Sequence, residues 1–173
     1  REFAKVPGLL LDNWVDAVAV SSTGELFAAG MFTASGSVPC SHVAQHTGSA
    51  WAPLGAGTGG RVTALALLAN GDLVAGGSFT TAGGAPASRL ARWDGTAWQP
   101  LGGGVDSNVA ALVGLPDGDL VVGGGFTTAG SAPAAQVARW APTCRPDVVS
   151  FGSGCVGSGG LNTLTAVTPP WDG

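Results

Sequence analysis

The stretch that decides the fold is Val62–Gly104, which reads VTALALLANGDLVAGGSFTTAGGAPASRLARWDGTAWQPLGGG. The same pattern occurs once before this stretch and partly once after it, at a constant step of 47 residues without insertion. The matching positions are Val15, Val62 and Val109; Phe32, Phe79 and Phe126; Trp51 and Trp98; and the triplets that begin at Gly24, Gly71 and Gly118. A fixed period of this length indicates a fold made of similar units packed side by side.

Turn signals divide the central repeat into four short segments of strand length. The expected strands are Val62–Leu68, Asp72–Gly77, Ser88–Trp93 and Ala97–Leu101. Asn70-Gly71 and Asp94-Gly95 are typical hairpin turns, and the loop Phe79–Gly84 is expected to be a plain connection between the second and third strands. Because no segment shows a sustained 3.6-residue apolar period, the sequence predicts an all-β fold.

The polarity of the strands predicts their order from the inside of each sheet to its edge. Val62–Leu68 and Asp72–Gly77 carry apolar residues on both faces, and a strand of this kind must be covered on both sides. The fourth strand carries Pro100, and Pro53 takes the same position one repeat earlier. Proline is largely confined to edge strands because it cannot donate to a sheet. The first two strands are therefore expected inside and the fourth outside, as in a propeller blade.

The combined pattern resembles a known class of repeat. Asn-Gly-Asp-Leu-Val-x-Gly-Gly-x-Phe, followed by Ala-Arg-Trp-Asp-Gly-x-x-Trp-x-Pro-Leu-Gly, is similar to the glycine-rich, kelch-like propeller repeats of secreted bacterial proteins. The resemblance covers roughly residues 15–140. It implies a β-propeller built from 47-residue, four-stranded blades, about three in this chain, and it implies no single activity.

The repeat boundaries give a domain map with an incomplete blade at each end. Residues 1–14 are expected to be the outer strand of an incomplete blade. Residues 15–57, 58–104 and 105–146 form blades 1, 2 and 3, and residues 147–173 begin a C-terminal β segment that resembles the start of a small sandwich. Blade 3 lacks the Asp-Gly-x-x-Trp of a fourth strand, and Glu2–Val6 is a candidate replacement.

Three blades are too few for a closed ring, because propellers typically contain ~4 to 8. The ring is therefore completed by missing sequence or by a second chain. Both ends break off inside patterns, which favours a fragment of a longer protein. Twofold assembly is the commonest form of oligomer, so our hypothesis for closure is a homodimer in which two chains complete a six-bladed ring.

The charge and the cysteine content limit the possible binding partners and the possible cellular location. The net charge is −4, with 7 basic and 11 acidic residues, which argues against a nucleic-acid partner. No apolar run approaches the ~18 residues of a membrane span. Cys144 and Cys155 bracket a short loop and are expected to form a disulfide, which indicates an oxidising, extracellular or cell-surface location. Cys40 is left over and is expected to be a small buried residue.

The two histidines are the only candidates for a catalytic site. Cys40, His42 and His46 share one face of the expected third strand of blade 1. At ~3.3 Å per residue, the two histidines are about 13 Å apart, too far to share a metal ion. The preferred interpretation is that they replace arginine and tryptophan in a diverged repeat. The alternative is a hydrolase whose site contains His42 and His46.

The remaining motifs do not indicate catalysis or a cofactor. The chain contains no Gly-x-Ser-x-Gly elbow, and the glycine-rich segment at residues 55–60 precedes a strand rather than the helix that a nucleotide site requires. No metal or cofactor site is therefore expected.

Three residues of blade 2 are the candidates for ligand binding. Trp93, Trp98 and Arg92 could contact a sugar or a protein, although packing explains recurrent tryptophans better. The sequence therefore favours a non-catalytic, extracellular binding or scaffold module that recognises a glycan or a protein.

Overall fold

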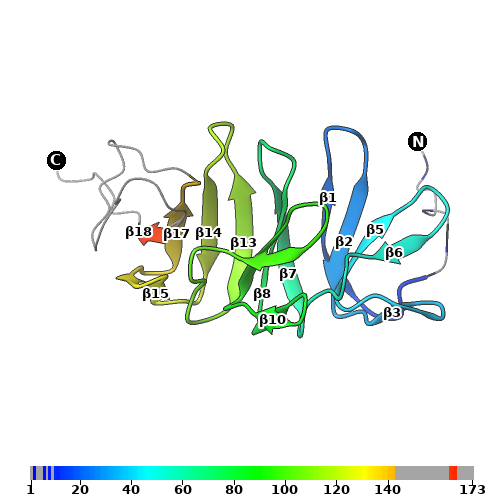
Figure 1. Ribbon diagram of the computed structural model, residues 1–173, viewed down its shortest axis with the longest axis horizontal. Helices are drawn as coiled ribbons and strands as arrows, with labels where there is room; N and C mark the ends of the chain where they lie inside the picture. Colours follow the sequence, from blue (N-terminus) through cyan, green and yellow to red (C-terminus); the bar gives the residue numbers. More distant parts are fainter. Residues whose placement is uncertain (1, 3–5, 7, 9, 143–163, 167–173) are drawn as a thin grey trace.

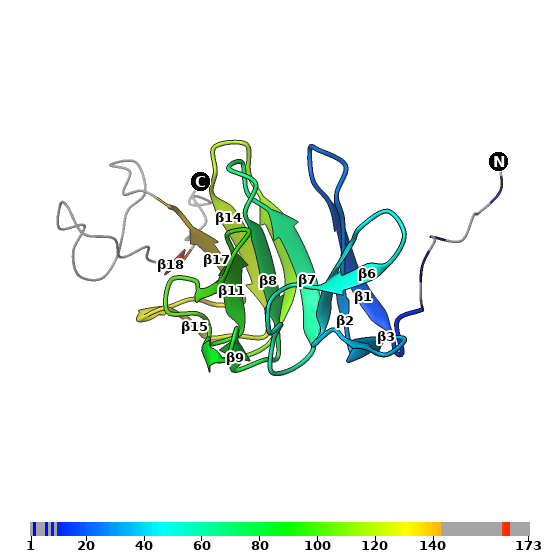
Figure 2. The same cartoon turned by 45° about the vertical axis from the view of Figure 1, so that its right-hand side comes forward.

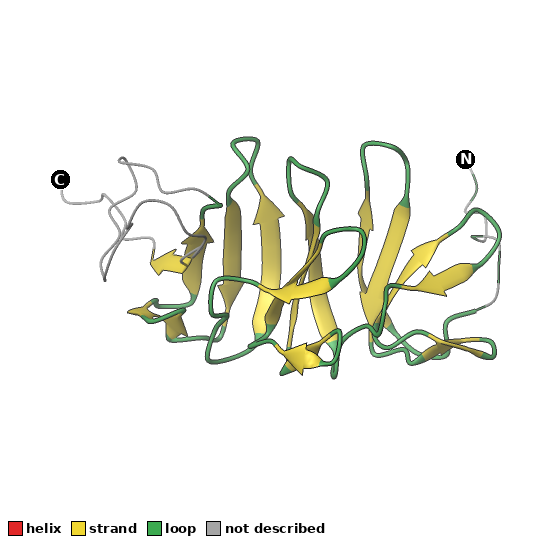
Figure 3. Cartoon of the chain, in the orientation of Figure 1, coloured by secondary structure: helices red, strands yellow, loops and turns green. Residues whose placement is uncertain are grey.

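The computed structural model describes residues 2, 6, 8, 10–142 and 164–166. This part of the chain contains strands and loops but no helix (Figure 3). The all-β class predicted from the sequence is confirmed. The expected disulfide between Cys144 and Cys155 lies outside the described residues, as does most of the expected N-terminal strand Glu2–Val6.

Three four-stranded antiparallel sheets form the three blades. Blade 1 consists of β1 (Val15–Val20), β2 (Leu26–Gly30), β5 (Val43–His46) and β6 (Trp51–Pro53); blade 2 of β7 (Val62–Leu67), β8 (Leu73–Gly77), β11 (Leu90–Trp93) and β12 (Trp98–Pro100); and blade 3 of β13 (Val109–Gly114), β14 (Leu120–Gly124), β17 (Val137–Trp140) and β18 (Leu164–Ala166). The first strand of each blade lies at one end of its sheet and the fourth strand at the other. This is the order that the polarity of the strands predicted.

The blades fan out from their first strands. The strands β1, β7 and β13 lie next to one another, with blade 1 extending to one side and blade 3 to the other (Figure 1). Blade 2 lies between them, and its strand β11 is seen beside β8 in the turned view (Figure 2). This arrangement, with sheets stacked face to face around their inner strands, is the architecture of a β-propeller.

Two hydrophobic cores lie between neighbouring blades, and a third, smaller one lies in blade 1, where Ala28, Phe32, Cys40 and Ala44 pack with Leu11 and Trp51. The first core joins Phe27 and Val43 of blade 1 to Val62 and Trp98 of blade 2. The second joins blades 2 and 3, and all five residues of β8 are buried between these two cores. A four-stranded sheet has no interior of its own, so each blade depends on its neighbours to remove its apolar surface from water.

The connection between the second and third strands is more ordered than expected. In each blade it forms a small two-stranded hairpin: β3 (Ala34–Ser35) with β4 (Val38–Pro39), β9 (Thr81–Ala82) with β10 (Ala85–Pro86), and β15 (Thr128–Ala129) with β16 (Ala132–Pro133). Cys40 follows the first hairpin and is buried, as expected; Ala87 and Ala134 take its place in the other blades and are buried too.

The fourth strand of blade 3 comes from the C-terminal segment. Residues 163–168, Thr-Leu-Thr-Ala-Val-Thr, alternate in polarity as a single strand would, and residues 147–173 were expected to begin a further β segment. The structure pairs β18 with β17, in the register Ala138↔Ala166 to Trp140↔Leu164. The position for which the N-terminal strand was a candidate is therefore taken by residues of the same chain's C-terminal part.

One residue before the third strand adopts left-handed backbone geometry in every blade. His42, Arg89 and Gln136, which are 47 residues apart, have φ angles of 67°, 63° and 70°. Their carbonyl oxygens accept hydrogen bonds from the N–H groups of Gly30, Gly77 and Gly124 at 3.0, 3.1 and 2.9 Å. The placement of His42 in an extended strand beside His46 was wrong, because the chain reverses at His42 and β5 begins only at Val43.

This geometry makes Gln136 a position where glycine should stabilise the fold. A left-handed conformation costs a side-chain-bearing residue roughly 1–2 kcal/mol, and glycine adopts it without that cost. We expect Gln136→Gly, at an exposed position, to raise the free energy of unfolding by about 0.5–1 kcal/mol after the entropic cost of glycine is subtracted. Gln136→Val should lower it. Urea unfolding measures both, and equal effects of the two substitutions would contradict the prediction.

Candidate functional site

A polar hollow lies between blade 1 and blade 2. Its volume is about 240 Å³. It lies beside the start of β2 in blade 1 and beside the two hairpin turns of blade 2, at Asn70-Gly71 and Asp94-Gly95. The lining residues are Glu25, Phe27, Gln45, Asn70, Gly71, Asp72, Leu73, Trp93, Asp94 and Gly95. Two blades thus contribute opposite walls, and apolar residues form part of them.

Trp93 forms the aromatic part of the blade 2 wall. It is the last residue of β11, is half-buried and pairs across the sheet with Trp98 at the start of β12. The centroids of the two rings are 5.5 Å apart, with planes inclined by 48°. Trp98 therefore supports the ring of Trp93, while part of Trp93 remains accessible from the hollow.

Trp98 itself has a packing role. It is 6% exposed and belongs to the core between blades 1 and 2. Its indole Nε1 donates a hydrogen bond to the carbonyl oxygen of Leu54 over 2.8 Å, which joins the outer strand of blade 2 to the end of blade 1. This bond satisfies the one polar group of a side chain that is otherwise in apolar surroundings.

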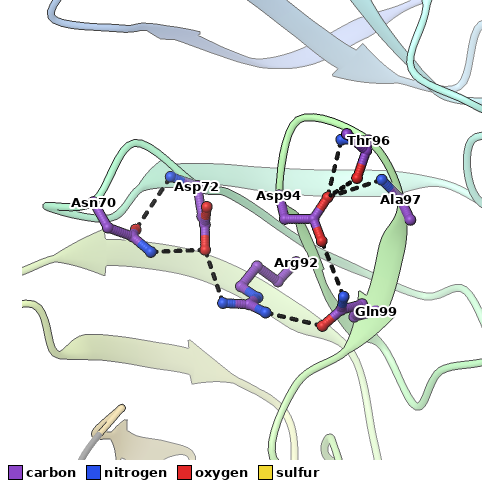
Figure 4. Close-up of polar contacts among 7 residues, drawn as sticks. All are labelled: Asn70, Asp72, Arg92, Asp94, Thr96, Ala97 and Gln99. Carbon is purple, nitrogen blue, oxygen red and sulfur yellow. Dashed lines mark hydrogen bonds and ion pairs between the residues drawn. The ribbon is translucent and has the colours of Figure 1, made fainter.

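A chain of hydrogen bonds orders the polar groups of the blade 2 wall (Figure 4). Asn70 donates to Asp72, and Arg92 donates to Asp72 and to Gln99, over 2.8, 2.8 and 2.9 Å. Gln99 in turn donates to Asp94 over 2.9 Å. Arg92, one of the candidate binding residues, is therefore held by its own blade, and its guanidinium compensates the charge of the Asp72 carboxylate.

Asp94 is fixed by the turn that it begins. One carboxylate oxygen accepts hydrogen bonds from the hydroxyl and N–H of Thr96 and from the N–H of Ala97, at 2.7, 2.9 and 2.9 Å. The side-chain hydrogen bond from Thr96, together with the two backbone donors, lowers the pKa of Asp94 to about 2. Asp94 is therefore a carboxylate at neutral pH.

In the blade 1 wall, a neutral side chain takes the place of the arginine that pairs with a carboxylate in the other blades. Gln45 donates to Glu25 over 2.8 Å where blade 2 has Arg92 and Asp72 and blade 3 has Arg139 and Asp119. The recurrence shows that the cross-strand pair is part of the blade. Because Gln45 is neutral, the wall formed by blade 1 presents an amide and an uncompensated carboxylate to the hollow.

The two histidines are separated from the hollow and from each other. His42 precedes β5 and His46 ends it, and neither lines the hollow. Nδ1 of His42 donates to the carbonyl oxygen of Gly30 at 3.2 Å. Nδ1 of His46 accepts from the N–H of Gly48 at 3.2 Å, and the ring packs edge-on against Trp51 with centroids 5.1 Å apart. The His46–Trp51 pair repeats the contact that Trp93 makes with Trp98.

Among the residues that the structure describes, no group of three or more His, Cys, Asp or Glu side chains is placed to hold a metal ion. The described part of the chain also contains no helix with the length and apolar character needed to cross a membrane.

Comparison with known proteins identifies the type of repeat. A family model described as "Domain of unknown function (DUF5122) beta-propeller" matches residues 68–93 and 115–142. These segments run from the end of the first strand to the end of the third in blades 2 and 3. No curated protein matches the chain, and no solved structure does. The match and the architecture together show that the chain is built of β-propeller repeats similar to that family.

Proposed function

We propose that the chain is a non-catalytic binding module of an extracellular or cell-surface β-propeller, and that its ligand is a carbohydrate. The observation that carries the proposal is the hollow between blades 1 and 2, where the half-buried Trp93 lies among fixed amide and carboxylate groups. The roles follow from the contacts. Trp93 contacts the sugar, while Trp98 and Arg92 hold Trp93 and the polar wall in place.

The chemistry of the walls suits a neutral sugar. An aromatic ring offers a flat apolar surface to the C–H face of a pyranose, and carboxylate and amide groups accept and donate to its hydroxyls. Glu25, Asp72 and Asp94 all carry carboxylates, and the nearby Arg92 is already paired with Asp72. An anionic ligand would therefore meet repulsion. The volume is below the ~300 Å³ of the smallest drug-sized pockets, which favours a single sugar ring of a longer glycan.

The positions of the histidines support a module without catalytic activity. A hydrolytic site needs a nucleophile and a base that face one reacting atom. His42 and His46 lie at opposite ends of β5, and a backbone group binds Nδ1 of each ring. The hollow that could hold a ligand is lined by other residues.

Trp93→Ala should weaken carbohydrate binding without unfolding the protein. We expect a glycan array to identify a neutral glycan ligand, and titration calorimetry to show at least about tenfold weaker binding by the variant, since ~1.4 kcal/mol corresponds to a factor of ten. Trp51→Ala is the matched control, because Trp51 is also half-buried but does not line the hollow. Unchanged affinity of Trp93→Ala, or the absence of any glycan ligand, would contradict the proposal.

A further inference from the structure

The interface between blades 2 and 3 contains a counterpart of the hollow, but this counterpart is closed. Trp93 and Asp72, which line the hollow, have Trp140 and Asp119 as their equivalents in blade 3. Trp93 is half-buried, whereas Trp140 is only 1% exposed. The same repeat position is therefore accessible at one interface between blades and covered at the next.

The closed counterpart keeps polar groups of the kind that bind a sugar. Nε1 of Trp140 and Oδ1 of Asp119 are both buried, and neither has a hydrogen-bond partner among the described residues. One group is a donor and the other an acceptor, and a sugar hydroxyl can pair with either. Because buried polar groups are almost always paired in folded proteins, these two point to a polar site common to both interfaces and open only at the first.

An arginine lies on the blade 2 side of the closed interface, where the hollow has a glutamine. Arg92 pairs across the sheet with Val74, and cross-strand partners share a face. Val74 packs in the same core as Trp140, so Arg92 lies on the face of blade 2 that contacts blade 3. The equivalent of Arg92 in blade 1 is Gln45, which lines the hollow together with Trp93.

The arginine is held across the width of its sheet. Its guanidinium donates to Asp72 and to Gln99, so it extends from the start of β8 to β12 (Figure 4). In blade 1 the side chain of Gln45 is shorter, and its cross-strand partner is Ala52, which takes the position of Gln99. Blade 1 therefore presents less side-chain volume at these two positions than blade 2 does.

Two other substitutions distinguish the interfaces. Phe27 takes the position of Val74, but it is 6% exposed and belongs to the core of blades 1 and 2. Pro142 takes the position of Gly95, and its Cγ would lie 3.9 Å from a Cβ atom added to Gly118. Closure by this proline and closure by the arginine lead to different expectations, because only the second can be reproduced by an arginine in blade 1.

We infer that Gln45 keeps the hollow between blades 1 and 2 open to a sugar, and that Arg92 closes the equivalent interface between blades 2 and 3. The inference rests on the proposed carbohydrate site and adds the residue that determines whether an interface between blades can bind. An arginine at position 45 would pair with Glu25, as Arg92 pairs with Asp72, and would cover Trp93. The Glu25 carboxylate would then no longer be available to sugar hydroxyls.

Gln45→Arg tests the inference by two readouts. We expect hydroxyl-radical footprinting with mass spectrometry to show several-fold slower oxidation of Trp93. Titration calorimetry should show at least about tenfold weaker binding of the neutral glycan. Gln136→Arg is the matched control, because it makes the same exchange at an exposed position away from the hollow, where the equivalent residue of blade 2 is Arg89. This control should leave both readouts unchanged.

Arg92→Gln is the reciprocal test, read at the other interface. The shorter amide can still donate to Asp72, as Gln45 does to Glu25, so the blade should fold. We expect several-fold faster oxidation of Trp140 in the same footprinting experiment. Circular dichroism checks that the variant is folded.

The possible results separate this inference from the proposed function. Gln45→Arg with Trp93 as accessible as in the wild type, or with unchanged glycan affinity, would overturn the inference and leave the proposed function standing. Arg92→Gln with Trp140 as protected as in the wild type would overturn it too. Absence of any glycan ligand for the wild type would contradict the proposed function, and footprinting would still measure which interface is open, because it needs no ligand.

Discussion

Replacing Trp98 with alanine is expected to lower the free energy of unfolding by about 3–5 kcal/mol, the usual loss when a large buried aromatic residue is removed. Trp98 is almost wholly buried in the core that joins blades 1 and 2. The substitution would leave a cavity between the blades, and the carbonyl oxygen of Leu54 would lose its donor. Unfolding by urea, followed by tryptophan fluorescence and circular dichroism, measures the loss.

Two further substitutions separate the contributions to that loss. Trp98→Phe keeps an aromatic ring but removes the indole donor, and we expect it to cost about 1–3 kcal/mol for the unsatisfied carbonyl group and the smaller ring. Trp51→Ala alters the equivalent position of blade 1, where the ring is only half-buried, and should cost less than Trp98→Ala. Equal losses for Trp51→Ala and Trp98→Ala would show that burial between two blades is not the cause.

The blades could be predicted because their signals are local and repeated. Asn70-Gly71 and Asp94-Gly95 mark hairpin turns by their own backbone preferences, and the strands between them have apolar positions at matching places in each copy. The strands β7, β8, β11 and β12 lie within the expected segments, and only their ends differ. The position of the fourth strand at the edge of each sheet could be predicted from Pro53 and Pro100. Proline lacks a backbone N–H wherever it occurs, so this signal is also local.

The features that were missed depend on contacts rather than on local pattern. Hairpins with two-residue strands, such as β9 with β10, are too short to show a period. The alternation in residues 163–168 indicated a strand but could not name its partner, and β17 is its neighbour only after the chain has folded. The left-handed backbone before the third strand was hidden because the equivalent residues of blades 2 and 3, Arg89 and Gln136, belong to types with no preference for it.

The candidate site, too, could be predicted from the sequence only in part. Trp93 could be named from the sequence as an aromatic residue at a conspicuous repeat position, but Trp98 and Arg92 could not be told apart from it. The structure separates them, since Trp98 is buried and Arg92 is paired with Asp72, whereas Trp93 lines the hollow. Glu25 and Gln45 went unnoticed, because only the packing of blade 1 against blade 2 brings them opposite Trp93.

Gly77→Ala is expected to destabilise the protein by about 3 kcal/mol or more, through overpacking against backbone that cannot move aside. The added Cβ would lie 2.1 Å from the carbonyl oxygen of Arg61 and 2.9 Å from Cα of Val62. That carbonyl accepts a hydrogen bond from the N–H of Ser78 at 3.0 Å, so moving it would break the closing pair of the β7–β8 ladder. Gly30 and Gly124, the equivalent residues, have the same close approach, to Trp14 and Asn108.

Gly125→Ala is the matched control in the neighbouring repeat position. Its added Cβ would meet only Oγ of Ser107, at 3.8 Å, and the equivalent positions already carry Met31 and Ser78. We expect Gly125→Ala to leave the stability unchanged or to raise it by up to about 1 kcal/mol, because alanine restricts the unfolded chain. Urea unfolding of the two variants compares a glycine that the ladder requires with one that it does not. A Gly77→Ala protein as stable as Gly125→Ala would contradict the proposed role of close backbone approach in pairing the inner strands.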